Sequence, residues 1–266
     1  MVVTTTGPTL VDAYSGSAGA WRAGPEVVYD RLAEVLVARS PVALAGAGVL
    51  DVGAGTGAAS RAARAAGARW VVAADPAFGM VALDARRRPP AVTGDARHLP
   101  FRDGAFDAAV AAFSLNHLGE PALGLREMAR VTRPGGALLA SSYAADDNHP
   151  VKAAVEAALD ARGWRPQPWF VALRADAIPV LATVEGFRAA AAAAGLEGEV
   201  EAVRVGFPEL GPAELVAWRL GMAQHASFVA DMTPPERAEL ANEAAGRLGA
   251  APVLVRSVLV FSGVRR

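Results

Sequence analysis

The sequence predicts an α/β fold in which helices cover both faces of a doubly wound, mostly parallel sheet. The order of apolar and amphipathic segments along the chain supports this prediction. Between residues 47 and 145, short apolar segments alternate with amphipathic segments of helical periodicity. Apolar strands separated by amphipathic helices are typical of a parallel sheet that is buried on both sides.

The individual elements follow from composition and from local stop signals. Strands are predicted at residues 48–52, 70–75, 91–95, 106–113, 136–143, 199–207 and 253–264. Helices are predicted at residues 59–67, 78–88, 120–132, 151–163, 183–195, 212–228 and 234–249. Gly67 ends the first of these helices, and Pro89 ends the second. Arg86–Arg88 are predicted to lie in the last turn of that second helix, where the helix dipole favours cations.

Composition excludes several classes of protein. The formal net charge is −1, and the Lys and Arg residues are not clustered, so we expect no nucleic-acid partner. The absence of cysteine excludes disulfides, thiolate metal sites and a cysteine nucleophile. The N-terminus lacks the features of a signal peptide, and charges interrupt each apolar run before the roughly 20 residues that span a bilayer. We expect a cytoplasmic protein that does not act on membranes; the oligomeric state stays open.

A glycine-rich loop follows the first strand, in the segment VLDVGAGTGAAS. Gly53, Gly55 and Gly57 lie at alternate positions, and the spacing also fits the G-x-G-x-x-A pattern of dinucleotide-binding folds. Asp51 precedes the loop, where a carboxylate would repel a pyrophosphate at the helix N-terminus. It would instead favour a cationic ligand such as S-adenosylmethionine (SAM), which carries a sulfonium and an ammonium group.

Two further acids end the next two strands. Asp75 is placed to accept hydrogen bonds from ribose hydroxyls, a feature that SAM shares with NAD. Asp95 is placed to accept from an adenine amine, with the amide of Ala96 beside it. Each acid alone is equally consistent with a helix N-cap. Together they indicate a ligand site at the carboxyl edge of the sheet.

These segments resemble class I SAM-dependent methyltransferases, in particular the branch of ubiquinone and menaquinone methyltransferases that act on small molecules. The resemblance covers about residues 45–145 and rests on VLDVGAGTG, AADPAFGM, GDARHLPFRDGAFDAAVAAFSLNHL and LREMARVTRPGGALLAS. It implies a Rossmann-like, seven-stranded sheet whose last strand is antiparallel. It also implies that SAM is the cofactor and that the following residues contact it: Asp51, Gly53, Ala54, Gly55, Asp75, Met80, Asp95, Ala96 and Phe113. Pro76 is placed among these contacts as well, although the family usually has a small polar residue at this position.

The expected organisation of the chain combines this resemblance, which covers the core and the N-terminal lid, with a break in the alternation of strands and helices after residue 145, which predicts one sheet with two insertions. Residues 1–30 form a lid-helix region, in which Tyr14 and, more weakly, Trp21 close over the cofactor. Residues 31–145 form the SAM-binding core. Residues 146–182 form a helical insertion that caps the substrate. Residues 183–266 complete the sheet and carry a second helical insertion at about 208–251.

His117, after the fourth strand, is the candidate catalytic base, because a histidine titrates near neutrality. The alternative is that it shapes the pocket or caps the next helix. No metal is expected, since Ser114 occupies the position where some relatives of this fold place a metal-binding Asp. The segment DDNHP at residues 146–150 is interpreted as a turn that caps the following helix.

The substrate is expected to contact the insertions. Their aromatic residues suit an apolar or aromatic small molecule, or else form the core that fastens the insertions to the sheet; they are Trp164, Trp169, Phe170, Trp218 and Phe228. Polar candidates for orienting a substrate are Arg165, Gln167, Arg219 and His225. Methyl transfer to such a metabolite is the expected activity. A SAM-fold protein that catalyses another reaction, such as cyclisation, and a SAM-binding subunit without catalysis are the alternatives. A dehydrogenase is disfavoured because it has no use for Asp51 or Asp95.

Overall fold

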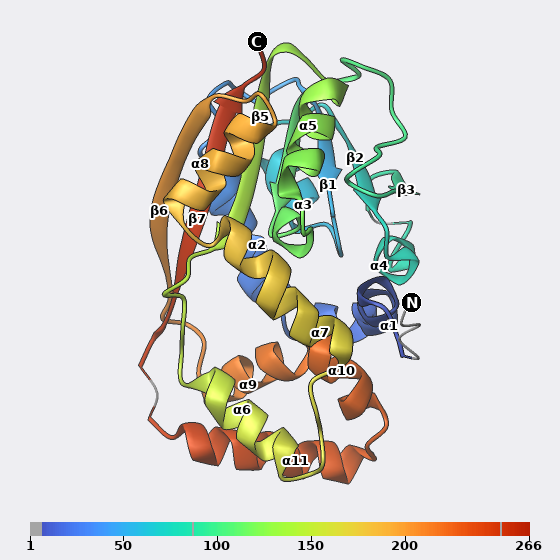
Figure 1. Cartoon of the computed structure of the whole chain (residues 1–266). Coiled ribbons are helices and arrows are strands. Elements are labelled where there is room, and N and C mark those ends of the chain that lie inside the picture. Colours follow the sequence, from blue (N-terminus) through green and yellow to red (C-terminus); the bar gives the residue numbers. More distant parts are fainter. Residues whose placement is uncertain (1–6, 87, 251) are drawn as a thin grey trace, which may run out of the picture.

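A seven-stranded sheet forms the centre of the computed structural model, which describes residues 7–86, 88–250 and 252–266. The strands follow the order β3-β2-β1-β4-β5-β7-β6 (Figure 1). Their bounds are Gly48–Val52 (β1), Trp70–Asp75 (β2), Ala91–Thr93 (β3), Phe106–Ala112 (β4), Thr132–Tyr143 (β5), Gly198–Phe207 (β6) and Leu254–Val264 (β7). β1 to β5 pair in parallel, whereas β7 is antiparallel to both β5 and β6. The predicted Rossmann-like sheet, with its antiparallel last strand, is confirmed.

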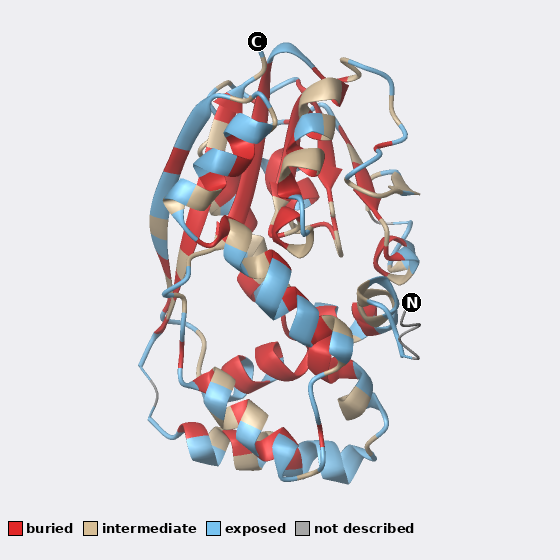
Figure 2. Cartoon of the chain, viewed as in Figure 1, coloured by how far each residue is buried: buried red, intermediate tan, exposed pale blue. Residues whose placement is uncertain are grey.

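Helices cover both faces of this sheet. Val49 packs with the residues of α2 and α3 on one face, and its neighbour Leu50 packs with those of α5 and α8 on the other. The central strands are therefore buried from both sides, whereas the edge strands β3 and β6 are partly exposed (Figure 2). These helices have the bounds Glu26–Val37 (α2), Ala58–Ala65 (α3), Pro121–Val131 (α5) and Val184–Ala193 (α8).

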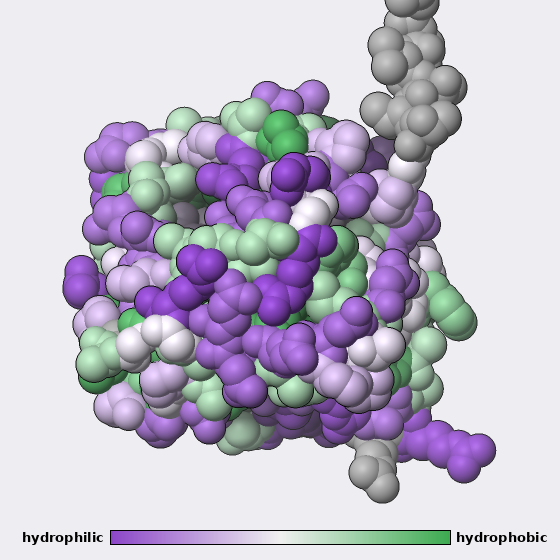
Figure 3. Space-filling model, turned by 90° about the horizontal axis from the view of Figure 1, so that it is seen from below, coloured by the Kyte–Doolittle hydropathy of each residue, from purple (hydrophilic) through white to green (hydrophobic). Residues whose placement is uncertain are grey.

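The remaining helices lie at the carboxyl edge of the parallel strands (Figure 1). α6, α9 and α11 contact one another there, α10 packs against α9, and α1 packs against α9 and α10. Seen from this end, the surface is mostly hydrophilic with scattered hydrophobic patches (Figure 3). The bounds are Leu10–Ala23 (α1), Val151–Asp160 (α6), Pro168–Ala172 (α7), Pro212–Leu220 (α9), Ala223–Ala230 (α10) and Pro234–Leu248 (α11).

Several predicted elements differ from the structure. The helix predicted at 78–88 is only a short one, Phe78–Ala82 (α4), and Asp84 then adopts a left-handed conformation with φ 51°. Because the helix ends before residue 84, Pro89 does not terminate it and Arg86 and Arg88 do not lie in its last turn. Arg87 lies outside the described residues. The third strand stops at Thr93, so Asp95 lies in the loop that follows. The predicted helix 212–228 divides into α9 and α10 at Gly221, whose Cα packs too closely against α1 for a side chain.

Candidate functional site

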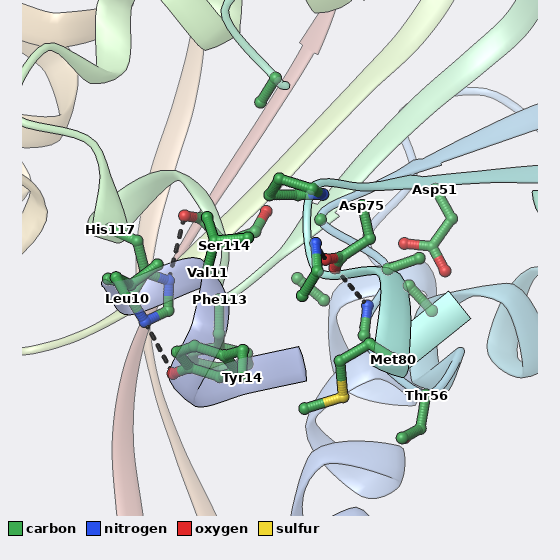
Figure 4. A pocket seen from close by; sticks show the side chains of 18 of the residues that line it. Leu10, Val11, Tyr14, Asp51, Thr56, Asp75, Met80, Phe113, Ser114 and His117 are labelled. Atoms are coloured by element: carbon green, nitrogen blue, oxygen red, sulfur yellow. Dashed lines mark hydrogen bonds between the residues drawn. The ribbon is translucent and has the colours of Figure 1, made fainter. Parts of the chain in front are cut away.

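A cavity opens at the carboxyl ends of β1, β2 and β4, where the strand order of the sheet reverses between β1 and β4. Its volume is about 310 Å³. The structure brings together in its wall all the cofactor and catalytic residues predicted from the sequence, several of which are drawn in Figure 4: Tyr14, Asp51, Gly53, Ala54, Gly55, Asp75, Pro76, Met80, Asp95, Ala96, Phe113 and His117. Trp21 also lines the cavity.

The glycine loop after β1 forms one wall of the cavity. Gly53 has φ 66° and Gly55 has φ 52°, values that favour glycine. A Cβ atom on Gly53 would lie 2.2 Å from Cβ of Ser114, so the loop can only pass this close to Ser114 without a side chain. A Cβ atom on Gly55 would meet no protein atom within 4 Å. Gly53 is therefore required by packing within the protein, whereas Gly55 leaves space in front of the loop.

Asp51 lies at the end of β1 and is 1% exposed. Its Oδ2 accepts hydrogen bonds from the backbone N–H of Ser60 at 2.8 Å and from the Ser60 hydroxyl at 2.6 Å. Burial raises the pKa of this carboxyl group to about 6, although the bonds from Ser60 oppose the shift. Among the described residues no donor reaches Oδ1, so this oxygen is available to a donor in the cavity.

Asp75 ends β2 and organises the backbone around it. Its Oδ2 accepts from the N–H of Gly55 at 2.8 Å, and its Oδ1 accepts from the N–H of Ala77 at 2.8 Å. Burial raises the pKa of Asp75, and the two backbone hydrogen bonds oppose that shift. Each carboxylate oxygen has room for a second hydrogen bond. The acid thus holds the glycine loop and can still accept from a ligand.

Arg88 also supports the glycine loop, and sequence reasoning missed it by placing it in a helix. Its Nη1 donates to the carbonyl oxygens of Gly55 at 3.0 Å and of Met80 at 2.7 Å. Burial lowers the pKa of Arg88, while the charges of Asp51 and Asp75 oppose this shift. The available signal was Pro89, which shows that the chain turns here but not where the guanidinium points.

Asp95 lines the cavity from the loop after β3, with its carboxylate paired to Arg97. The Nη2 of Arg97 lies 2.6 Å from Oδ2, and the backbone N–H of Arg97 donates to Oδ1 at 2.8 Å. These contacts lower the pKa of Asp95. An amine of a ligand would therefore share Asp95 with Arg97, a competition that the sequence did not indicate.

His117 is held at both ring nitrogens (Figure 4). Its Nδ1 lies 3.2 Å from the carbonyl oxygen of Ser114, which can only accept, so Nδ1 carries the proton. Nε2 therefore accepts from the hydroxyl of Tyr14, at 3.0 Å. Burial lowers the pKa of His117 to about 4, and burial raises the pKa of Tyr14. This pair joins α1 to the loop after β4.

Phe113 adjoins this pair and adopts a left-handed conformation with φ 55°. Such a conformation is uncommon for a non-glycine residue and is often found at functional sites. Its ring packs against Tyr29, with 5.6 Å between ring centroids, and against Tyr143, with 4.5 Å. Tyr29 also lines the cavity, whereas Tyr143 lies behind Phe113 and outside the cavity wall.

The residues predicted to contact substrate do not lie in the cavity wall. Trp164 and Trp218 are buried in the core that joins the insertions to the sheet, and Trp169 packs beside Phe170 in a small cluster with Leu10. The exposed guanidinium of Arg165 binds backbone carbonyls of its own insertion. The remaining candidates differ in burial. Phe228 is partly buried against the same core, Arg219 and His225 are buried, and Gln167 is the residue before α7.

The segment at residues 146–150 leads into α6, and although its N-cap residue Pro150 makes no side-chain hydrogen bond, Nδ1 of His149 accepts from the first N–H of the helix, that of Val151, at 3.3 Å. Asp147 instead turns to β7, where its Oδ1 accepts from the N–H of Ser257 at 3.0 Å. Within the described residues, no three His, Asp or Glu side chains are grouped so that they could hold a metal ion. In the same part of the chain, each helix is too short or too polar to cross a membrane.

Comparison with known proteins agrees with this geometry. Residues 50–140 match the family described as methyltransferase domain. A demethylmenaquinone methyltransferase of Mycolicibacterium gilvum is 50% identical over 100 residues, which are 38% of this chain and 43% of that protein. The match thus spans less than half the length of the curated relatives.

Solved structures share the fold over most of the chain. The complex between the Haloferax volcanii Trm112 methyltransferase activator and its methyltransferase contains a chain that is 20% identical, with a TM-score of 0.60 and coverage of 98% of this chain and 99% of that one. The [4+2]-cyclase SpnF is 24% identical, with a TM-score of 0.51 and coverage of 89% and 80%. Residues 50–140 therefore match a methyltransferase domain, and the chain shares the fold of these solved structures.

Proposed function

We propose that the cavity binds SAM and that the protein transfers its methyl group to a small molecule. The observation that carries this proposal is that Asp51, Asp75 and the glycine loop converge on one cavity at the reversal point of the sheet. The residues fit this cofactor: Oδ1 of Asp51 is an available acceptor for an ammonium group, and Asp75 can accept from ribose hydroxyls. Gly55 leaves unfilled the space that a side chain would occupy.

SAM supplies an electrophilic methyl group when it is bound. The protein then has to hold the acceptor in line and to exclude water, and such positioning supplies roughly 7–11 kcal/mol of the barrier. α1 serves this purpose, because it places Tyr14 and Trp21 over the cavity. The hydrogen bond between Tyr14 and His117 ties this lid to the loop after β4.

The proposed acceptor is a small, largely apolar or aromatic metabolite, and the proposed reaction is independent of metal. Support comes from the apolar part of the cavity wall, which includes Leu10, Val11, Phe113 and Leu118. The curated relatives named as demethylmenaquinone methyltransferases point in the same direction. We place the reaction in the cytoplasm.

His117 remains our candidate base, although its hydrogen bond from Tyr14 and its lowered pKa limit how it can take a proton. Its Nε2 already accepts from Tyr14, so an acceptor hydroxyl must either displace Tyr14 or pass its proton through the Tyr14 hydroxyl. Its lowered pKa makes it a weak base at neutral pH. The alternative supported by the same contacts is that His117 positions the lid.

Calorimetry with SAM and with S-adenosylhomocysteine tests the first half of the proposal, with NAD as the control ligand. The second half is tested by release of S-adenosylhomocysteine from SAM in the presence of naphthoquinol and other small aromatic acceptors, with and without EDTA. Binding of NAD without SAM would refute the cofactor assignment. SAM binding without any S-adenosylhomocysteine release, on acceptors or in cell extract, would favour a reaction other than methylation.

A further inference from the structure

Next to the cavity, behind Phe113, lies a group of buried or partly buried polar side chains that the proposed reaction does not use. It consists of Tyr143 at the end of β5, Trp218 and Arg219 on α9, and Arg256 near the start of β7, and it is called the arginine cluster below. Tyr143 joins the cluster to the cavity wall, because its ring packs against Phe113 on one hand and contacts Arg256 on the other.

Arg256 is 3% exposed. Its Nη2 lies 2.7 Å from Oδ2 of Asp147, and its guanidinium carbon lies 4.1 Å from the ring centroid of Tyr143 and 4.7 Å from that of Trp218. Contact with ring faces stabilises a guanidinium without using its N–H donors. Nε and Nη1 of Arg256 have no hydrogen-bond partner in the described part of the chain.

Arg219 is 6% exposed and is more weakly paired. Its Nη2 lies 3.7 Å from Oε1 of Glu156, which is beyond hydrogen-bond distance, and its Nε has no partner among the described residues. Burial lowers the pKa of Arg219 to about 10, and the nearby charge of Arg256 adds to this shift. Two like charges are therefore buried together with incomplete compensation.

The charges around the cluster leave an excess of one cation. The cations are the buried Arg219 and Arg256 and the partly exposed Lys152, and the anions are the buried Asp147 and the partly exposed Glu156. Asp147 is shared, since its Oδ2 lies 3.3 Å from Nζ of Lys152 and 2.7 Å from Arg256. Buried charges are normally paired, so a monoanion would complete this set.

The donors without partners point to the same conclusion. Ten buried polar side-chain atoms lack a partner in the described residues, and five of them are donors in this cluster: Tyr143 Oη, Trp218 Nε1, Arg219 Nε, Arg256 Nε and Arg256 Nη1. Each unmet buried donor costs about 1–3 kcal/mol, and such groups are rare in native proteins. Their concentration beside a ligand cavity is the pattern expected of a binding site without its ligand.

We propose that the arginine cluster binds the carboxylate of the acceptor molecule, which makes the acceptor a small organic acid. This proposal rests on the methyl transfer proposed above. Arginine is suited to a carboxylate because its planar fork matches the two oxygens. With the carboxylate held by Arg256 and Arg219, the rest of the acceptor extends past Phe113 into the cavity; for this, the Tyr143 ring turns aside and its hydroxyl becomes a further donor to the anion.

Calorimetry on the protein saturated with S-adenosylhomocysteine tests this proposal. The probes are benzoate, phenylacetate and 2-naphthoate, each compared with its neutral amide. We expect at least one acid to bind at least tenfold more tightly than its amide, because the amide cannot balance the excess charge. Failure of all three acids to bind, or equal binding of acids and amides, overturns the proposal.

Variants locate the effect. Arg219→Gln and Arg256→Lys are each expected to weaken acid binding at least tenfold and to leave S-adenosylhomocysteine affinity within threefold of wild type. Arg165→Gln, at an exposed arginine of the first insertion, is the matched control and should change neither. If Arg256→Lys does not fold, Arg219→Gln decides, because its partner Glu156 is itself partly exposed. If Arg219→Gln binds the acids as tightly as wild type does, the proposal is contradicted. If the wild-type protein does not bind S-adenosylhomocysteine at all, the proposed function is contradicted instead.

Discussion

Replacing Gly55 by alanine tests the proposed SAM site with the smallest possible change. Gly55 lines the cavity, and its added Cβ would meet no protein atom within 4 Å. Because φ is 52° at this position, an alanine costs roughly 1–2 kcal/mol of stability. That is a minor part of the about 5–15 kcal/mol that stabilises a typical domain, so we expect Gly55→Ala to fold.

The same methyl group occupies space that the ligand needs. Adding a methyl group to a well-packed contact costs about 1–3 kcal/mol. Since about 1.4 kcal/mol is a tenfold change in affinity, the expected loss of SAM affinity is about 5- to 150-fold. The Gly55→Ala variant should therefore stay folded and bind SAM measurably more weakly than wild type.

Calorimetric titration with SAM and thermal unfolding measure the two effects separately. Gly163→Ala is the matched control, because Gly163 also has positive φ, 86°, and an added Cβ there meets no atom within 4 Å, but it lies outside the cavity wall. Both variants should lose a similar amount of stability, and only Gly55→Ala should lose SAM affinity. Wild-type SAM affinity in Gly55→Ala would falsify the placement of the cofactor against this loop.

Three further predictions follow from the contacts described above. Asp75→Ala should weaken SAM binding by about 1–3 kcal/mol in calorimetry, because it removes the proposed ribose acceptor and frees the Gly55 N–H; unchanged affinity would remove Asp75 from the site. His117→Ala should lower kcat at least about a hundredfold if His117 is the base. If the Tyr14–His117 pair only holds the lid, Tyr14→Phe and His117→Ala should lower kcat equally and by less, so kcat and SAM affinity measured for both variants distinguish the two roles. Burial lowers the pKa of His225 from 6.5 to about 3, so the stabilising effect of its neutral form is complete above pH 6.5 and is lost as the pH falls. Between pH 6.5 and pH 4.5, chemical unfolding should show that the free energy of unfolding falls by about 2–3 kcal/mol more for wild type than for His225→Gln; parallel pH profiles would contradict this.

Sequence reasoning located the cavity because its signals are local. Asp51 and Asp75 each end an apolar strand, and a glycine pattern follows the first of them. The carboxyl ends of parallel strands lie at the same edge of a sheet, so predicting the strands was sufficient to bring these residues together. The antiparallel last strand followed from the family resemblance and was confirmed.

Other features depend on how distant elements pack. Tyr14 and His117 are 103 residues apart, and their hydrogen bond exists because α1 lies over the loop after β4. The guanidinium of Arg88 returns to the glycine loop, although the sequence pattern favoured an exposed helix end. For the aromatic residues of the insertions the sequence left two places open, beside the substrate or in the core that fastens the insertions to the sheet, and Trp164 and Trp218 lie in the core.

The difference has a physical cause. Strand periodicity, glycine torsions and proline stops act over a few residues, so a sequence expresses them directly. Which side chains meet between elements depends on the burial of apolar surface over the whole chain, to which each residue contributes a small and non-directional part. The positions of Asp51 and Asp75 could therefore be predicted residue by residue, whereas the arginine cluster, assembled from β5, α9 and β7, exists only once those elements have packed together.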